Sequence, residues 1–393
     1  MIASLKRAVR HLDSAVGRTL GRRVVVVDAR TPMNFSILAP VAARLQQDPD
    51  IEVVFTADHP GGMSRALSAA GVAFEVHPRD AMKWRRVDLC VSADPWDPID
   101  LRRCSRRANF FHGVAGKYDL DSPDRLPAGF ADFDRVAFVN VDRLRRYLAA
   151  GVVKPESAVL VGYPKVDALV NGCFDAGAIR ARLRLDPHRR TAIYAPTWSP
   201  AASLHVAGER IVTSLVDAGL NVIVKLHDRS LDPTNEKFSG GVDWRARFAR
   251  MEAPGRIAFV ETGDSSPLLA ASDLMVTDHS SVGFVFYLLD RPMVIFDTPD
   301  LIRVARINPE KVALLRSAAR VVRTTYELGT AVLEEIEHPD RHSAARCAIA
   351  REMFYEPGTA TTRAVDMLYE LLHLPTQHPR DVSMRERIPA SLP

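Results

Sequence analysis

The stretch Ala271-Ser272-Asp273-Leu274-Met275-Val276-Thr277-Asp278-His279-Ser280-Ser281 carries most of the information about how this chain folds. The residues up to Val276 form a run typical of a strand, and the run from Val282 to Leu289 is typical of a helix. A carboxylate and two hydroxyls therefore stand at a predicted strand-to-helix turn. The unpaired N–H groups and partial positive charge of a helix N-terminus favour a bound phosphate or diphosphate. The same Asp-x-Ser-Ser pattern also suits an ordinary N-cap, so both interpretations stay open at this point.

Strands followed by helices recur on both sides of this stretch. Apolar runs rich in β-branched residues predict strands, and apolar residues at intervals of three or four predict helices. The predicted strands are 23–28, 51–56, 87–92, 109–111, 135–140, 191–195, 221–225, 257–261, 273–277 and 292–296. The predicted helices are 36–45, 63–70, 142–149, 207–218 and the segment from 281. Residues 162–187 have no strand character and are typical of a connector.

Alternating strands and helices with short links predict parallel sheets covered by helices on both faces. Two groups of about equal size predict an α/β protein with two Rossmann-like, doubly wound domains facing a central cleft. The first domain is assigned to residues 22–165 and the second to 166–357. A chain of 393 residues is long enough for two such cores. No Gly-x-Gly-x-x-Gly follows the first strand, which disfavours a nicotinamide or flavin enzyme.

The two ends of the chain differ from its middle. Residues 1–21 place apolar side chains at helical spacing with Lys6, Arg7, Arg10 and Arg18 between them, which predicts a basic amphipathic helix. Such a helix suits an anionic membrane surface, and it suits equally well a helix packed on its own domain. Residues 375–393 are rich in proline and charge and predict a flexible tail.

The bulk composition excludes several classes of protein. A net charge of +4 is too small to argue for nucleic acid. No apolar run reaches the roughly 18 residues that span a bilayer, and the N-terminus has no secretory apolar region. The four cysteines are scattered without C-x-x-C or zinc spacing, so we expect a cytoplasmic protein, either free or peripheral on the inner face of the membrane. No clustered carboxylates have metal-ligand spacing, so we expect no metal cofactor.

Polar side chains gather at the carboxyl ends of the predicted strands, where ligands of doubly wound sheets bind. His112 suits general-base work near neutral pH, and Gly113 lets a substrate approach the backbone. Taken singly, each candidate also has an ordinary structural explanation, but their coincidence on one rim predicts a site. The candidates are His112, Gly113 and Lys117 in the first domain and Thr197, Lys225, His227, Asp278, Ser280, Ser281, Arg303 and Arg306 in the second.

Five motifs, in this order, resemble the CDP-glycerol glycerophosphotransferase family, which comprises GT-B-fold enzymes of teichoic acid synthesis. They are Phe111-His112-Gly113, Gly162-Tyr163-Pro164-Lys165-Val166-Asp167, Tyr194-Ala195-Pro196-Thr197-Trp198, Lys225-Leu226-His227 and Thr277-Asp278-His279-Ser280-Ser281-Val282. The resemblance spans residues 109–370 and includes Phe354-Tyr355-Glu356-Pro357-Gly358. It implies that a helix at 358–374 returns to the first domain.

The resemblance implies a transferase that moves a glycerol phosphate, or a similar polyol phosphate, from a CDP-linked donor to a hydroxyl of a lipid-linked or glycan acceptor. CMP would leave. His112 would take the proton of the acceptor hydroxyl, with Gly113 and Lys117 on the acceptor side. His227 would stabilise the charge that moves onto the phosphates. The residues implied around the donor are Thr197, Lys225, Asp278, Ser280, Ser281, Arg303 and Arg306.

Five positions depart from the family pattern and leave the donor open. They are Val114 for threonine, Ser199 for arginine, Asp228 for proline, His279 for tyrosine and Val285 for an acid. The alternatives are a GT-B glycosyltransferase with a UDP- or GDP-sugar, a UDP-sugar 2-epimerase, and a non-catalytic nucleotide-binding or membrane-scaffold protein. An epimerase needs several carboxylates in the cleft, and the rim offers few. His112 and His227 argue against a non-catalytic role.

Overall fold

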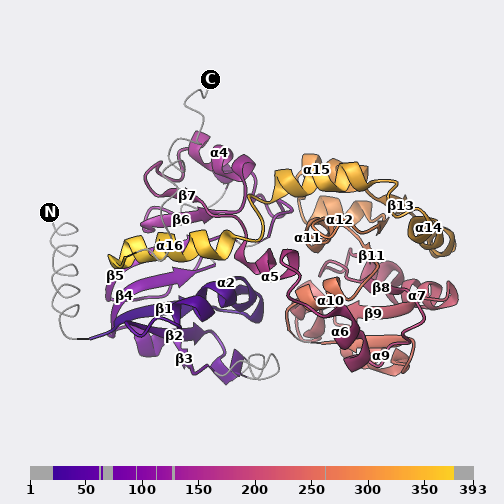
Figure 1. The fold of residues 1–393 in the computed structure, drawn as a ribbon, viewed down its shortest axis with the longest axis horizontal. Coiled ribbons are helices and arrows are strands. Elements are labelled where there is room, and N and C mark those ends of the chain that lie inside the picture. Colours follow the sequence, from indigo (N-terminus) through magenta and orange to yellow (C-terminus); the bar gives the residue numbers. More distant parts are fainter. Residues whose placement is uncertain are drawn as a thin grey trace.

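The structure is a computed structural model that describes residues 21–61, 63, 64, 74–93, 95–111, 113–125, 129–261 and 263–375. The predicted N-terminal helix, most of the predicted helix 63–70 and the tail after residue 375 lie outside these residues. The candidate base His112 lies outside them as well. The described chain forms two parallel α/β domains, one at each side of the view in Figure 1.

The first domain is built on a seven-stranded parallel sheet in the order β3-β2-β1-β4-β5-β6-β7. The valine run Val24–Val27 in the central strand β1 is buried, as expected of a strand covered on both faces. The strands are β1 (Arg23–Asp28), β2 (Ile51–Ala57), β3 (Val76–Pro78), β4 (Arg86–Ser92), β5 (Arg103–Phe110), β6 (Arg135–Phe138) and β7 (Ala158–Leu160).

The second domain is built on a six-stranded parallel sheet in the order β10-β9-β8-β11-β12-β13. Its strands are β8 (Thr191–Tyr194), β9 (Asn221–Lys225), β10 (Ile257–Val260), β11 (Leu274–Thr277), β12 (Met293–Phe296) and β13 (Arg320–Val322). β11 is a central, fully buried strand. The stretch Thr277 to Ser281 therefore comes at the carboxyl end of this sheet, beside the end of β8.

Helices cover both sheets and connect them. The first domain carries α2 (Pro32–Leu45), η1 (Arg79–Met82), η2 (Pro123–Arg125) and α4 (Val141–Ala149), and the link between the sheets carries η3 (Pro164–Val166), α5 (Asp167–Val170) and α6 (Ala176–Arg182). The remaining helices are α7 (Ser203–Asp217), η4 (Asp228–Leu231), α8 (Glu236–Ser239), α9 (Trp244–Met251), α10 (Ser266–Ala270), α11 (Val282–Tyr287), α12 (Pro299–Val304), α13 (Pro309–Ser317), α14 (Thr325–Glu337), α15 (Ser343–Met353) and α16 (Ala360–Leu372).

The last helix, α16, crosses back and lies on the first domain against α2 (Figure 1). Near its start, the buried Arg363 guanidinium donates to the Val161 carbonyl at 2.8 Å. Near its end, the Tyr369 hydroxyl donates to Asp48 at 2.8 Å. These two contacts fasten the end of the described chain to the domain in which it began.

The predicted fold class of two doubly wound parallel-sheet domains is confirmed. Three strands escaped prediction, namely β3, β7 and β13. Each has only three residues, which is too short for a periodic pattern to appear. Residues 162–187 contain no strand, as predicted, but they form three short helices instead of an irregular connector.

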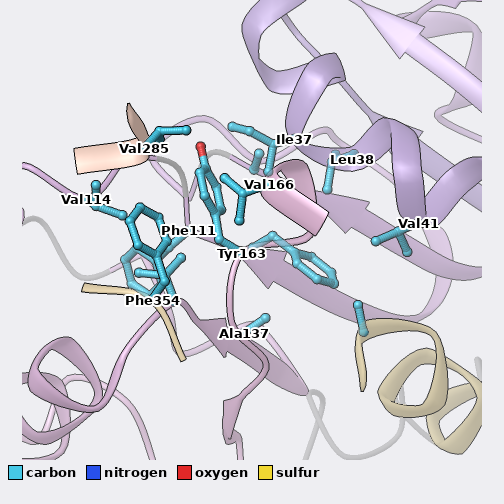
Figure 2. Close-up of a cluster of buried hydrophobic side chains, with 14 of the residues drawn as sticks. Ile37, Leu38, Val41, Phe111, Val114, Ala137, Tyr163, Val166, Val285 and Phe354 are labelled. Carbon is cyan, nitrogen blue, oxygen red and sulfur yellow. The ribbon is translucent and has the colours of Figure 1, made fainter. Parts of the chain in front are cut away.

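An apolar core continues through the junction of the two domains (Figure 2). Phe111 and Val114 from the first domain and Tyr163 from the link belong to one buried cluster with Val285 of α11. Val114 and Val285 are two of the departures from the family pattern. Both are buried, so the apolar replacements at these positions pack the domain junction, where burying a valine contributes on the order of 1.5 kcal/mol.

Candidate active site

Asp278 fixes the loop after β8 to the end of β11. Its fully buried carboxylate accepts hydrogen bonds from the Thr197 N–H at 3.0 Å and from the Ser203 hydroxyl at 3.0 Å. The adjacent Thr277 hydroxyl donates to the Ala195 carbonyl at 2.6 Å. Hydrogen bonds to a buried carboxylate are strong. Asp278, predicted to bind the donor, therefore lies beneath the site and positions Thr197.

The hydroxyls of Ser280 and Ser281 are only partly buried, and neither forms a hydrogen bond to any residue that the structure describes. Ser281 occupies the N-cap position of α11, but its side chain makes no capping hydrogen bond. The ordinary capping interpretation is therefore wrong for these serines. Both hydroxyls remain available to a ligand at the carboxyl end of β11.

His227 follows β9 and lies among cationic side chains. Its Nδ1 accepts a hydrogen bond from the Arg229 N–H at 3.2 Å, which leaves the proton of the neutral ring on Nε2. Burial, followed by the charges of Arg229, Lys225, Lys117 and Lys165, lowers the pKa of His227 to about 3. Four cations around one neutral imidazole are surroundings that suit a phosphate group.

Two of these cations are held in place by oxygen atoms of the second domain. Lys225 is buried and donates to the Glu261 carbonyl at 3.2 Å, and burial lowers its pKa. Lys165, in η3, pairs with Asp264 at 3.3 Å. Burial alone would lower the pKa of Lys165, but Asp264 raises it above the ordinary value. Lys165 therefore stays charged beside His227, a role that its motif alone did not reveal.

Lys117 reaches from the first domain into the second. Its ammonium donates to the Thr197 hydroxyl at 2.9 Å. Burial lowers the pKa of Lys117 to about 8, against the attraction of Asp278. The next residue, Tyr118, stacks on Trp198 with ring centroids 5.5 Å apart. The structure thus brings together Lys117 and Thr197, which were predicted on opposite sides of the cleft.

Arg143 fixes the segment that follows His112 in the sequence. This buried arginine of α4 donates to the Gly113 carbonyl at 2.7 Å and to the Asp121 carboxylate at 2.9 Å. Gly113 has a φ of +74°, and a Cβ there would meet no atom of the described residues within 4 Å, which leaves room for a close approach to its backbone. Arg143 and Asp121 were not predicted, because Arg143 lies inside the predicted helix 142–149 and Asp121 lies in a segment without a predicted strand or helix. The role of His112 stays a prediction.

The two predicted arginines have other partners. Arg303 of α12 is largely exposed and pairs with Asp300 in its own helix at 3.1 Å. Arg306 pairs with Asp119 of the first domain at 2.8 Å. Arg306 therefore joins the domains, and the prediction that these arginines neutralise a diphosphate gains no support from their contacts.

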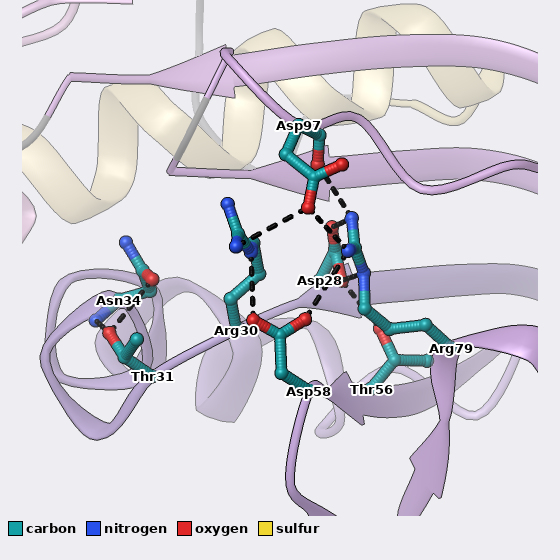
Figure 3. A network of polar contacts seen from close by, with 8 residues as sticks. All are labelled: Asp28, Arg30, Thr31, Asn34, Thr56, Asp58, Arg79 and Asp97. Atoms are coloured by element: carbon teal, nitrogen blue, oxygen red, sulfur yellow. Dashed lines mark hydrogen bonds and ion pairs between the residues drawn. The ribbon is translucent and has the colours of Figure 1, made fainter.

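The rim of the first domain carries a polar network that the sequence did not reveal (Figure 3). Arg79 donates to Asp28 at 3.1 Å and to Asp97 at 2.9 Å, and Arg30 donates to Asp58 at 3.0 Å. Burial raises the pKa of Asp28, with Arg79 opposing the shift. The network ties together the segments that follow β1, β2, β3 and β4. It therefore holds these four segments together at the carboxyl ends of their strands.

Across the described ranges, no three His, Cys, Asp or Glu side chains lie close enough together to hold a metal ion. No helix in the same ranges is long and apolar enough to cross a membrane.

Two Rossmann-like domains that meet beside a cation-rich site at the carboxyl ends of their strands define a GT-B-fold protein. The chain belongs to the CDP-glycerol:poly(glycerophosphate) glycerophosphotransferase family, whose sequence profile matches residues 147–370. It is similar to the teichoic acid glycerol-phosphate primase of Bacillus spizizenii, with 25% identity over 179 residues. This match covers 44% of the chain and 42% of the primase, so the chain spans less than half the length of that curated relative.

Solved structures support the same fold. The wall teichoic acid polymerase TagF superposes with a TM-score of 0.68 at 16% identity, covering 96% of this chain and 100% of that chain. MnaA of S. aureus, solved with UDP, superposes with a TM-score of 0.58 at 15% identity, covering 91% of this chain and 99% of that chain. At these identities the likeness establishes the fold alone.

Proposed function

We propose that this chain transfers a glycerol phosphate, or a similar polyol phosphate, from a CDP-linked donor to an acceptor hydroxyl and releases CMP. Membership of the family supports the reaction class. The observation that carries the proposal is that four cations, Lys117, Lys165, Lys225 and Arg229, act on neutral His227. Such a concentration of positive charge matches the two phosphates of the donor and the charge that moves onto CMP as it leaves.

In the proposed reaction, the acceptor oxygen attacks the phosphorus that bears the polyol. A new P–O bond forms, and the P–O bond to CMP breaks, with its electron pair leaving on CMP. His112 takes the proton of the acceptor hydroxyl. The Ser280 and Ser281 hydroxyls and the Nε2–H of His227 donate to phosphate oxygens. Catalysis then rests on positioning and electrostatics, as in other phosphoryl transfers.

The low pKa of His227 allows its protonation to respond to the charge of the donor during the proposed reaction. A bound phosphate places negative charge beside the ring, which raises the pKa of His227 from its low value. The imidazole then gains proton affinity at the step in which negative charge develops on CMP. We propose that this histidine and the surrounding cations do this work without a metal ion.

The acceptor and the place of action are further parts of the proposal. We infer a lipid-linked or glycan acceptor and a cytoplasmic protein that works at the inner face of the membrane. The basic pattern of residues 1–21 supports this proposal. A teichoic acid primase among the relatives supports it as well.

A GT-B enzyme that uses a UDP-sugar is the second candidate, because MnaA with UDP shares the fold. Three of the carboxylates described near the site are already engaged, however, and only Asp228, beside His227, forms no ion pair or side-chain hydrogen bond with the residues that the structure describes. Asp121 pairs with Arg143, Asp264 pairs with Lys165, and Asp278 holds the loop at Thr197. Epimerase chemistry needs carboxylates that can move protons. Phosphoryl transfer therefore fits the site better.

A thermal-shift screen of CMP, CDP, CDP-glycerol, UDP and GDP tests the donor, because a ligand that binds the native state raises its Tm. We expect stabilisation by CDP-glycerol and CDP. Stabilisation by UDP alone would rule the proposal out. The matching kinetic test is His112→Ala, which we expect to abolish CMP release while CDP-glycerol still raises Tm. Unchanged CMP release would remove His112 from the mechanism.

A further inference from the structure

Trp84 presents a large apolar surface to solvent on the first domain. Its side chain is 67% exposed and makes no ring contact or hydrogen bond with the residues that the structure describes. It lies in the turn before β4, between Lys83 and Arg85. An exposed tryptophan between cationic side chains is typical of a membrane–water interface, where the ring sits at the level of the lipid headgroups.

The turn belongs to an edge of the sheet that is rich in positive charge. The strands β1, β4 and β5 are neighbours, and their register places Arg86 opposite Arg103. The Arg86 guanidinium also donates to the Arg22 carbonyl at 3.1 Å, so the three strand starts lie side by side. We call this surface the basic edge; it comprises Arg22, Arg23, Lys83, Trp84, Arg85, Arg86, Arg102 and Arg103.

Acidic side chains offset only part of this charge. Glu52 pairs with Arg85, Asp88 pairs with Arg86, and Asp100 pairs with both Lys83 and Arg102. Asp48 and Asp50 add two more carboxylates nearby. Seven cationic side chains against five carboxylates leave the edge positive. An excess of positive charge beside an exposed tryptophan matches an anionic lipid surface in both charge and polarity.

The start of the chain joins the same edge. β1 begins at Arg23, on the side of the first domain that faces away from the second domain (Figure 1). The segment before it carries Lys6, Arg7, Arg10 and Arg18 among apolar residues. Its point of attachment therefore coincides with the basic edge.

We propose that the basic edge with Trp84 is the surface by which the first domain docks on an anionic lipid bilayer. The active site lies at the opposite ends of the same strands, and the six residues of β1 span about 20 Å at 3.3 Å each. The acceptor hydroxyl must then stand about that far from the lipid surface. This part rests on the proposed function, and it favours a hydroxyl at the end of an extended glycan or polyol-phosphate chain.

Flotation of the full chain with vesicles tests the surface. Wild-type protein is expected to float with vesicles that contain phosphatidylglycerol and not with pure phosphatidylcholine. Arg22→Ala and Arg102→Ala should each weaken binding about fivefold, the effect of one charge near the surface, and Trp84→Ala should weaken it as well. The matched controls in the second domain are Arg320→Ala and Tyr326→Ala, which remove an exposed cation and an aromatic ring that is 92% exposed. Equal flotation of all these variants would overturn the proposal.

Quenching of tryptophan fluorescence by brominated lipid gives an independent readout. The wild-type chain should be quenched, and most of this quenching should disappear in Trp84→Phe, which keeps the other three tryptophans. Quenching that is unchanged in Trp84→Phe would overturn the docking orientation.

A transfer assay with a soluble acceptor distinguishes a failure of the docking proposal from a failure of the proposed reaction. Trp84→Ala should leave that transfer intact, whereas His227→Ala should lose it and still bind vesicles.

Discussion

The Lys117 ammonium of the first domain donates to the Thr197 hydroxyl of the second domain at 2.9 Å. Thr197 is in turn held by Asp278 through its backbone N–H. Lys117 of the first domain therefore contacts the loop at Thr197, which Asp278 of the second domain holds in place. Because Lys117 is also one of the four charges that lower the pKa of His227, the cationic site is complete only when the two domains are together.

The pKa of Lys117 predicts how activity responds to pH. This pKa is lowered to about 8 by burial, so the side chain is charged below pH 8 and loses its charge as the pH rises through that value. We expect kcat/KM for the donor to fall above pH 8. In Lys117→Arg the charge persists, and the fall should move to higher pH. Lys117→Met should lower kcat/KM about 10- to 100-fold at pH 7, the cost of one charge-assisted hydrogen bond. Identical pH profiles for the wild type and Lys117→Arg would contradict this assignment.

The two serines after β11 should affect donor binding without affecting stability. Their hydroxyls make no hydrogen bond within the described chain, so Ser280→Ala and Ser281→Ala should leave Tm unchanged. Each should raise the KM for the donor about 10-fold, since one hydrogen bond to a charged group is lost. Thr324 is the matched control, because it caps α14 through a full capping box with Glu327. Thr324→Ala should lower stability by about 1 kcal/mol and leave KM unchanged. A loss of stability in the serine variants would restore the capping interpretation.

How far the sequence predicts this site depends on where each residue lies relative to the strands. Lys225 is the last residue of β9, and His227 and Ser280 come within three residues of the end of a strand, so the carboxyl-end rule found them. Arg143 lies on a helix far along the chain from Gly113, and only the folded packing of α4 brings them together. The spacing of apolar residues along the sequence does not reveal a contact between residues that lie far apart in the chain. The same holds for Arg306, which follows a strand but turns to Asp119 across the domain junction.

Asp278 should behave as a structural residue with an effect on binding. Its buried carboxylate accepts hydrogen bonds from Thr197 and Ser203, and an amide in its place would set N–H groups against those donors. Asp278→Asn should therefore lower the free energy of unfolding by about 1–3 kcal/mol and raise the KM for the donor. Urea denaturation measures the first effect. The control is Asp300→Asn, a change on the exposed face of α12, which should stay within about 0.5 kcal/mol of the wild type. A wild-type unfolding midpoint for Asp278→Asn would show that the loop does not depend on this carboxylate.

Arg143 offers a way to separate positioning from stability at the acceptor side. The guanidinium both neutralises Asp121 and holds the Gly113 carbonyl. Arg143→Met leaves the Asp121 charge buried without its partner, so we expect a loss of about 3–5 kcal/mol in the free energy of unfolding. Adding Asp121→Leu removes that charge and should recover much of the stability. The Gly113 carbonyl stays unheld in both variants, so turnover should remain low in the double variant while CDP-glycerol still raises its Tm. If turnover returned together with stability, the arginine would be only structural, and the segment after His112 would need no anchor of its own.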